Sequence, residues 1–380
     1  MSSKTILFLC SWYPNKKAPT LGNFVQRHAN AIAQKHKVVV LFATSIKNQT
    51  EDFIIEKQFA ENLSEYIVYY KKPTNKLIQL FWVFKALNYG YQEITKKHTI
   101  HFIHLNVIRP LGFFAFYLKT FKKLRYVITE HWTGFLPSNN YFEKLSFFEK
   151  SLIRVVGRNA EAIFPVSQDL GKNMGTKGIA NTYYPIPNVV KEVDFFPEDE
   201  SEDFFLHVSH LKQEHKNIFG ILEAFKQVVK SQPHVKLIIV GDEEKEHVKN
   251  KISDLNLEDH IVLMGPLDSA SIATLMKKAL AFVLFSNYEN LPCVLEEAQM
   301  CGCRIISTNV GGISEFFKSN NEDNILVEPH RIDDLAIAMI AFAKPENFDK
   351  KIARANKATQ LFSVKAISEN YNLAYKQLNL

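Results

Sequence analysis

Strand-length apolar runs alternate with stretches of helical periodicity along almost the whole of this 380-residue chain. Regular alternation of strand and helix is typical of parallel sheets that are covered by helices on both faces. The pattern restricts the fold more than any other feature of the sequence, and it predicts the α/β class. The length allows two domains of ordinary size.

The predicted strands form two consecutive sets of six, which favours two Rossmann-like domains over one barrel. They cover residues 5–10, 37–43, 65–70, 100–106, 125–129, 162–166, 204–209, 235–241, 261–265, 281–285, 304–307 and 325–327. The predicted helices cover 22–36, 76–97, 111–123, 141–158, 217–231, 244–255, 269–279, 292–301 and 331–343. Pro185 and Pro187, followed by the acidic stretch 198–203, indicate a hinge. We expect domains over 1–186 and 187–361, with ligands bound at the carboxyl ends of strands in a cleft between them.

Charge is distributed unevenly along the chain. Residues 1–190 contain 25 Lys and Arg against 11 Asp and Glu, whereas residues 191–380 contain 21 against 29. A basic half and an acidic half suggest domains with different partners. The basic half suits anionic lipid or a phosphorylated acceptor, and segments 76–91 and 121–123 could lie on a membrane surface. The alternatives are lysines that only solubilise the surface and a core helix over 76–91.

The cellular location follows from cysteine use and hydropathy. The four cysteines, at positions 10, 293, 301 and 303, have no metal-ligand spacing, so we expect reduced thiols in a cytoplasmic protein. No signal-peptide pattern is visible, and the longest apolar stretch, 111–118, is far shorter than the ~20 residues needed to span a bilayer. Contact with a membrane would therefore be peripheral.

Two carboxylates, Glu289 and Glu297, flank the junction between a predicted strand and a predicted helix. Carboxylates accept hydrogen bonds from paired hydroxyls, which suits a polyhydroxylated ligand over the strand end. Pro292 fits the first turn of the helix, whose N-terminus favours phosphate. Sugar hydroxyls together with phosphate indicate a nucleotide sugar.

The block from Ser286 to Glu315, including Gly302 and the pair Gly311-Gly312, resembles the retaining glycosyltransferases of family 4, which have the two-domain GT-B fold. The resemblance implies that Glu289 contacts hydroxyls of the donor sugar and that Glu297 holds the ribose. It also places Asn290 and Leu291 in the donor-binding loop. A final helix over 362–380 is expected to cross back onto the N-terminal domain. The family usually has proline at position 304, where this chain has arginine.

The resemblance extends to the segment 207–217, where Lys216 matches a lysine that contacts the donor pyrophosphate. A fixed cation there would stabilise charge on the leaving diphosphate. His210 stands where the family usually has arginine. Histidine can still donate a hydrogen bond to phosphate, but its charge depends on pH.

Three residues of the basic half complete the expected site. Gly22 matches a glycine that brings the N-terminal loop close to donor phosphate and acceptor. His131 matches a histidine that reaches toward the reacting centre. Arg109, at the end of another predicted strand, is a candidate for binding an anionic group of the acceptor.

Several motifs are missing from the sequence: Asp-x-Asp, the Walker loop and Gly-x-Gly-x-x-Gly. We therefore expect transfer without a metal or other cofactor, from a nucleoside diphosphate sugar to a glycan or lipid-linked acceptor. Surface polysaccharide biosynthesis is the pathway that the resemblance favours, and no nucleic-acid partner is expected. Two alternatives stay open: a sugar-nucleotide epimerase of the same fold, and a non-catalytic subunit that only binds nucleotide sugar.

Overall fold

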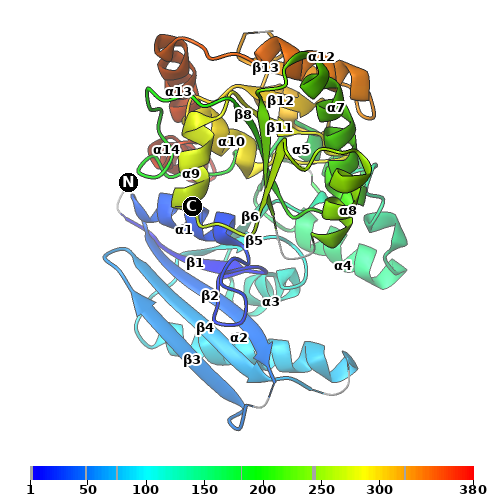
Figure 1. The fold of residues 1–380 in the computed structure, drawn as a ribbon. Helices are drawn as coiled ribbons and strands as arrows, with labels where there is room; N and C mark the ends of the chain where they lie inside the picture. The colour runs from blue at the N-terminus through cyan, green and yellow to red at the C-terminus, as the bar shows by residue number, and fades with distance from the viewer. Residues whose placement is uncertain (1–2, 48, 74–75, 181, 242–244, 321) are drawn as a thin grey trace. The chain divides into compact units, whose positions relative to one another are not determined.

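The computed structural model of the protein describes residues 3–47, 49–73, 76–180, 182–241, 245–320 and 322–380. Its contacts divide the chain into two compact units (Figure 1). Unit 1 comprises Met1–Val189 and Val364–Leu380, and unit 2 comprises Val190–Ser363. Each unit contains one sheet of mainly parallel strands. The prediction of two Rossmann-like α/β domains is confirmed.

The sheet of unit 1 has the strand order β3-β4-β2-β1-β5-β6-β7. The order reverses between β1 and β5, where doubly wound sheets bind ligands at their carboxyl ends. The strands are β1 (Thr5–Cys10), β2 (Lys37–Ile46), β3 (Phe53–Phe59), β4 (Leu63–Lys71), β5 (Phe102–Asn106), β6 (Tyr126–Glu130) and β7 (Ile163–Pro165).

The edge strand β3 departs from the predicted all-parallel sheet, because it pairs antiparallel with β4 (Figure 1). We did not predict it from the sequence. Its residues Glu56, Lys57 and Gln58 interrupt the apolar run, and most of its side chains are at least partly exposed. A strand with no buried side chain needs no continuous apolar run.

The helices of unit 1 begin where the local sequence supplies a cap. Ser146 and Glu149 form a capping box at the start of α4, so the predicted helix 141–158 is divided into a short 3-10 turn and α4. Ser167 caps α5, which we did not predict. The helices are α1 (Asn23–Ala33), α2 (Lys76–Thr95), α3 (Gly112–Lys122), α4 (Phe147–Arg158), α5 (Gln168–Thr176) and α14 (Val364–Gln377), with 3-10 turns η1 (Thr133–Phe135) and η2 (Phe142–Lys144).

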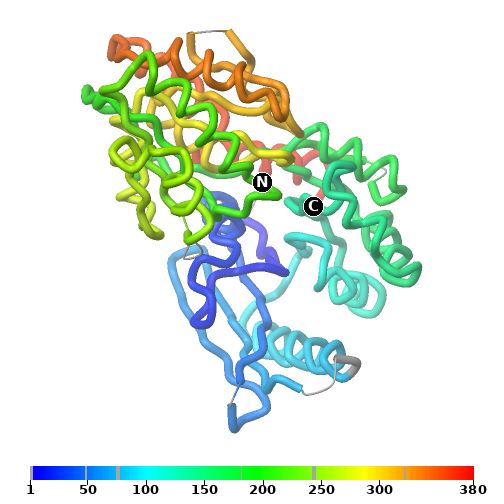
Figure 2. Tube along the Cα trace, turned by 45° about the vertical axis from the view of Figure 1, so that its right-hand side comes forward, coloured from blue at the N-terminus to red at the C-terminus, as the bar shows by residue number. Residues whose placement is uncertain are grey.

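The last helix, α14, belongs to unit 1 although it follows unit 2 in the chain (Figure 2). Ile367, Tyr371 and Tyr375 are buried in the same apolar cluster as residues of β1, β2 and α1. The expectation that the final helix returns to the N-terminal domain is confirmed.

The sheet of unit 2 has the order β10-β9-β8-β11-β12-β13, and all its strand pairs are parallel. The strands are β8 (Phe204–Ser209), β9 (Lys236–Gly241), β10 (Ile261–Met264), β11 (Ala281–Leu284), β12 (Ile305–Thr308) and β13 (Asn324–Val327). The helices are α6 (Gln213–Lys216), α7 (Ile218–Ser231), α8 (Glu246–Asp254), α9 (Ser269–Lys278), α10 (Cys293–Met300), α11 (Ile313–Phe316), α12 (Ile332–Phe342) and α13 (Phe348–Phe362). We did not predict α13.

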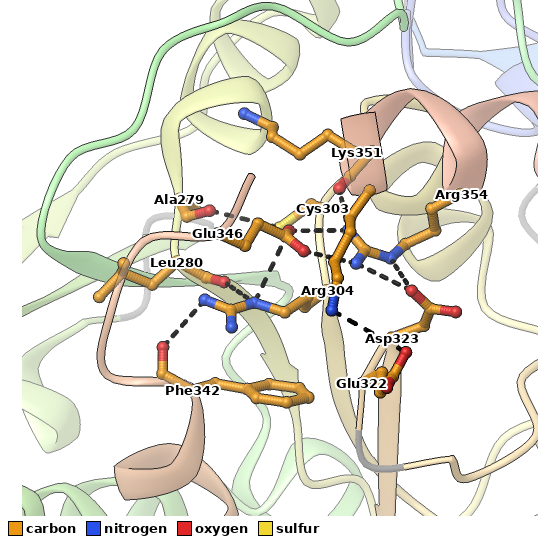
Figure 3. A network of polar contacts seen from close by, with 12 residues as sticks. Ala279, Leu280, Cys303, Arg304, Glu322, Asp323, Phe342, Glu346, Lys351 and Arg354 are labelled. Carbon is orange, nitrogen blue, oxygen red and sulfur yellow. Dashed lines mark hydrogen bonds and ion pairs between the residues drawn. The ribbon is translucent and has the colours of Figure 1, made fainter. Parts of the chain in front are cut away.

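Two buried arginines connect β12 and α13 to the rest of unit 2 (Figure 3). Arg304 donates to the backbone carbonyls of Leu280 and Phe342, at 2.9 and 3.0 Å. Arg354 forms ion pairs with Asp323 and Glu346, at 2.9 and 2.7 Å. These contacts give Arg304 a structural role, which accounts for arginine at the position that departs from the family pattern.

Candidate active site

The carboxyl ends of β8 and β11 are the structural centre of the candidate site in unit 2. These strands are neighbours at the point where the strand order reverses. β8 continues into α6, which ends at Lys216, and β11 continues into a loop that contains Glu289. Lys216 Nζ donates to Glu289 Oε1, and the two residues are only 7% and 5% exposed. The structure therefore joins two predicted site residues in a buried ion pair.

His215 extends this ion pair into a larger cluster. Its Nε2 lies 3.4 Å from Glu289 Oε1, and its Nδ1 lies 3.1 Å from Nε2 of His210. Its ring is stacked on Tyr288, with 4.3 Å between centroids and 4° between planes. We did not predict His215 as a site residue. The only signal was its position in the segment of His210 and Lys216, since Tyr288 and Glu289 come from a distant part of the chain.

The charge state of Glu289 follows from its neighbours. Burial would raise its pKa, but the charge of Lys216 and the hydrogen bond and charge of His215 lower it, to about 2. The carboxylate is therefore ionised at neutral pH and forms a true ion pair with the lysine. An ion pair that is this well buried would leave a strongly destabilised charge if either partner were removed.

The loop that carries Glu289 is held by backbone contacts on both sides. Asn287 N donates to the carbonyl of His215 at 2.8 Å, and Gly312 N donates to the carbonyl of Asn290 at 2.8 Å. Gly311 has φ +57°, and a Cβ atom there would lie 1.9 Å from the carbonyl oxygen of Glu289. Only glycine fits this approach, which gives the Gly-Gly turn a direct part in placing Glu289.

The other predicted donor-side residues lie in the same loop and in the following helix. Asn290 and Leu291 are 4% and 5% exposed. Glu297 is on α10 and is 7% exposed, so it is not a solvent-facing helix residue. Pro292 is not in the first turn as we expected, because it is extended and caps α10, which begins at Cys293.

In unit 1, His131 follows β6 and packs among aromatic rings. Its ring centroid lies 4.7 Å from that of Phe24 and 5.1 Å from that of His28. Burial lowers its pKa well below the usual value, and His28 lowers it further. His131 is therefore neutral at pH 7, which suits it to exchange hydrogen bonds with a hydroxyl group.

Glu130 connects the loop that carries His131 to the loop before Arg109, and we did not predict it. Its buried carboxylate accepts hydrogen bonds from the backbone N–H groups of Ile108, His131 and Trp132, at 3.0, 2.9 and 2.8 Å. Burial raises the pKa of Glu130 to about 7, although these hydrogen bonds favour the charged form. A glutamate that ends an apolar strand gives no sequence signal for this role.

A chain of buried hydrogen bonds connects α14 to the sheet of unit 1. Tyr371 Oη contacts His28 Nδ1 at 2.9 Å and Thr129 Oγ1 at 3.0 Å. Thr129 in turn contacts His104, and His104 contacts Tyr375. The ring of His28 lies against both Tyr371 and His131, so this one side chain links the C-terminal helix to His131.

Arg109 lies in a shallow aromatic pocket of about 380 Å³ at the reversal point of the unit 1 sheet. The pocket is lined by Trp12, Arg109, Pro110, Trp132 and Tyr141. The guanidinium carbon of Arg109 lies 5.5 Å from the Trp132 ring centroid, within the range of a cation–π contact. Its Nη2 forms an ion pair with Glu149 at 2.9 Å.

Gly22 shapes the same region from the N-terminal loop. It has φ +65°, and a Cβ atom there would lie 2.7 Å from the backbone carbon of Trp12. The glycine therefore allows the start of α1 to approach the loop that presents Trp12 to the pocket. The predicted site residues thus form two groups: Gly22, Arg109 and His131 in unit 1, and the remaining six in unit 2.

Comparison with known proteins assigns unit 2 to a family. Residues 190–359 match the family Glycosyl transferases group 1, so unit 2 carries a domain of that family.

Three curated relatives are similar in sequence. Vi polysaccharide biosynthesis protein VipC/TviE of Salmonella typhi is 33% identical over 103 residues, which are 27% of this chain and 18% of that protein. Poly(glycerol-phosphate) alpha-glucosyltransferase of Bacillus subtilis is 27% identical over 165 residues, 43% of this chain and 24% of that protein. Uncharacterized glycosyltransferase MJ1178 of Methanocaldococcus jannaschii is 24% identical over 300 residues, 79% of this chain and 81% of that protein. The chain thus spans about a fifth of the length of the first two.

Solved structures match over nearly the full length. Sucrose-phosphate synthase from Thermosynechococcus elongatus has a TM-score of 0.77 and 19% identity, with 99% of each chain covered. Anabaena Alr3699/HepE in complex with UDP and glucose has a TM-score of 0.69 and 18% identity, with 98% of this chain and 100% of that chain covered. At these identities the likeness shows the fold, which is GT-B.

Three further observations concern the described part of the chain. No helix there is both long and apolar enough to span a membrane. Within the same residues, no group of three or more His, Cys, Asp and Glu side chains is placed to hold a metal ion. The four cysteines are free thiols.

Proposed function

We propose that this protein is a retaining glycosyltransferase that moves a hexose-type sugar from a nucleoside diphosphate donor to a glycan or lipid-linked acceptor. The observation that carries the proposal is the buried Lys216–Glu289 pair at the carboxyl ends of β8 and β11, within the domain that matches group 1 glycosyltransferases. Similarity to a Vi polysaccharide biosynthesis protein and to a poly(glycerol-phosphate) alpha-glucosyltransferase supports surface polysaccharide biosynthesis as its pathway.

The pair suits a ligand that carries phosphate and hydroxyl groups close together. A donor phosphate would take the ammonium of Lys216 as its partner, and sugar hydroxyls would donate to the carboxylate of Glu289. The N-terminal turn of α10, which follows in the chain, favours phosphate through its dipole. Glu297, on the same helix, is our candidate for the ribose hydroxyls. In this arrangement protein cations and amides hold the diphosphate without a metal.

The expected reaction takes place on one face of the sugar. The bond between the anomeric carbon and the donor phosphate oxygen breaks, and the acceptor oxygen bonds to the same face of that carbon. The acceptor hydroxyl gives its proton to the leaving phosphate oxygen. Glu289 then positions the sugar and does not attack it, and Lys216 stabilises the negative charge that develops on the diphosphate.

The pocket in unit 1 is the candidate acceptor site. Trp132 and Tyr141 offer flat apolar faces, and Arg109 has further donors on the nitrogens that do not contact Glu149. Because Glu149 compensates the charge of Arg109, the pocket suits sugar hydroxyls as well as the anionic group that we expected from the sequence. Neutral His131 would then hydrogen-bond to hydroxyl groups of a bound sugar.

A patch on α2 and α3 supports peripheral contact with an anionic membrane on its cytoplasmic face. The two helices pack through Phe84 and Tyr117, whose ring centroids are 4.9 Å apart. One turn away on each helix, Phe81 and Phe121 are 56% and 68% exposed, and Lys122 is exposed beside Phe121. Aromatic side chains flanked by lysines suit an interface with anionic lipid.

Co-sedimentation with phosphatidylglycerol vesicles at low and high salt tests the membrane contact. We expect binding at low salt that is weakened by Phe81→Ser with Phe121→Ser. Ile337→Ser, at a position on α12 that is 65% exposed, is the matched control and should have no effect. Absence of binding at low salt would remove this part of the proposal.

A thermal-shift screen against a panel of nucleotide sugars, followed by product analysis, tests the activity. A glycosyltransferase shows transfer or slow donor hydrolysis. An epimerase changes the sugar without any acceptor, and a non-catalytic subunit binds donor with neither outcome. The Lys216–Glu289 pair favours transfer, and either of the other results would replace our proposal.

A further inference from the structure

The contact between His210 and His215 requires one proton to be shared between two rings. His210 Nε2 and His215 Nδ1 are 3.1 Å apart, so one nitrogen donates and the other accepts. The second nitrogen of His215 lies 3.4 Å from Glu289 Oε1, which is an ionised acceptor. Because Nε2 of His215 faces this ionised carboxylate, the proton of a neutral His215 is favoured on Nε2, and Nδ1 then accepts from His210. A further proton then has one place to bind, Nδ1 of His210.

The net charge of this cluster is what makes that proton important. Lys216 and Glu289 form an ion pair, so their charges cancel in the free protein. With both histidines neutral, the cluster carries no net charge with which to attract a diphosphate. One proton on the histidine pair gives the whole cluster a net positive charge. This charge lies on the exposed side of the cluster, because His210 is exposed whereas Lys216 is buried.

The groups around His210 disfavour its charged form in the free protein. Burial lowers the pKa of His210, and the charges of Lys216 and His215 lower it further, while Glu289 raises it. His207, on β8 beneath the pair, is buried and hydrogen-bonded to Ser209, and burial lowers its pKa to about 4, so it does not compete for the proton. A phosphate placed beside His210 would favour the charged form.

We propose that His210 and His215 act as one proton-binding pair in the donor site, so that binding of a nucleotide sugar takes up one proton. The inference rests on the proposed function, because it assumes that the diphosphate lies beside Lys216. His215 is a positioning residue: its stacking on Tyr288 and its contact with Glu289 hold its ring so that Nδ1 faces Nε2 of His210.

Calorimetry with UDP-glucose and GDP-mannose tests the inference, because the diphosphate of a nucleotide sugar does not titrate near neutral pH. Titrations in buffers of different ionisation enthalpy should show uptake of close to one proton per ligand at pH 8. Between the pKa of the free pair and the higher pKa of the complex, the dissociation constant should rise by up to about tenfold per pH unit. If either nucleotide sugar binds without proton uptake, the inference is overturned and the proposed function is left intact. If neither nucleotide sugar binds at any pH, the inference and the proposed function are both overturned.

Three variants locate the proton. His210→Gln and His215→Gln should each abolish proton uptake and give a pH-independent, weaker affinity. His210→Arg supplies a permanent cation and should restore at pH 8 the affinity that the wild type has at pH 6. His234→Gln, at an exposed position before β9, is the matched control and should keep the full pH dependence. A full pH dependence in His210→Gln would exclude the pair as the origin of the proton.

Discussion

The buried carboxylate of Glu130 accepts a hydrogen bond from the backbone N–H of Ile108, 3.0 Å away. The same carboxylate accepts from the N–H groups of His131 and Trp132. One side chain thus holds together the loop before Arg109 and the loop that carries His131, which are our candidate acceptor-binding segments.

Glu130→Gln should destabilise unit 1, because an amide N–H₂ would face at least one backbone N–H that now has an acceptor. We expect a loss of about 1–3 kcal/mol in the free energy of unfolding. Urea unfolding followed by tryptophan fluorescence measures this, since Trp12, Trp82 and Trp132 are the three tryptophans of the chain and all belong to unit 1. An unchanged transition would contradict the bridging role.

The raised pKa of Glu130 also predicts a pH effect. Its pKa is about 7 in the folded protein and 4.5 in its ordinary state, so between these values the folded state binds more protons than the unfolded chain. The free energy of unfolding of the wild type, relative to Glu130→Gln, should therefore fall as the pH rises from 5 to 7. If this difference in unfolding free energy rises with pH instead, the hydrogen bonds to the carboxylate lower the pKa of Glu130 more than burial raises it.

Removing either member of the Lys216–Glu289 pair should abolish transfer while leaving unit 2 folded. Each of Lys216→Ala and Glu289→Ala leaves an unpaired buried charge and should cost about 3–5 kcal/mol of stability. The double variant Lys216→Met with Glu289→Leu should recover much of that stability but no activity. Near-wild-type turnover by either single variant would refute the assignment of the site.

Gly311→Ala tests how the Glu289 loop is held. A Cβ atom would lie 1.9 Å from the Glu289 carbonyl oxygen, and φ +57° is strained for alanine, so the loop must move. We expect donor affinity to fall at least tenfold. Gly265→Ala is the matched control in unit 2, because only the end of the flexible Lys245 side chain lies near that position. Equal effects of both substitutions would argue against a role for the turn.

Tyr371→Phe tests the hydrogen-bond network of α14. Loss of the hydroxyl leaves His28 and Thr129 without one buried partner each, which should cost about 1–3 kcal/mol. Thermal unfolding followed by tryptophan fluorescence measures the change. Tyr89→Phe, at a position on α2 that is 38% exposed, should leave the transition unchanged. A silent Tyr371→Phe variant would mean that water replaces the hydroxyl.

The parts of the fold that were predictable are those with a local signal. The buried parallel strand β11 is a continuous apolar run, and β8 is apolar except at His207 and Ser209. Lys216 and Glu289 lie in recognisable segments that follow these strands. Their pairing depends on the sheet order, which places strands from distant segments next to each other. β3 escaped prediction because Glu56, Lys57 and Gln58 interrupt its apolar run, and His215 because Tyr288 and Glu289 are far away in sequence.

The return of α14 has a consequence for the order in which the protein is made. Unit 2 is continuous from Val190 to Ser363, whereas unit 1 needs residues from both sides of it. A ribosome at roughly 5–20 residues per second needs about 10–40 s to pass from one part of unit 1 to the other. During that time the apolar surface that Tyr371 and Tyr375 later cover is open, and unit 2 can be complete first. The domain synthesised first is therefore the one that finishes folding last.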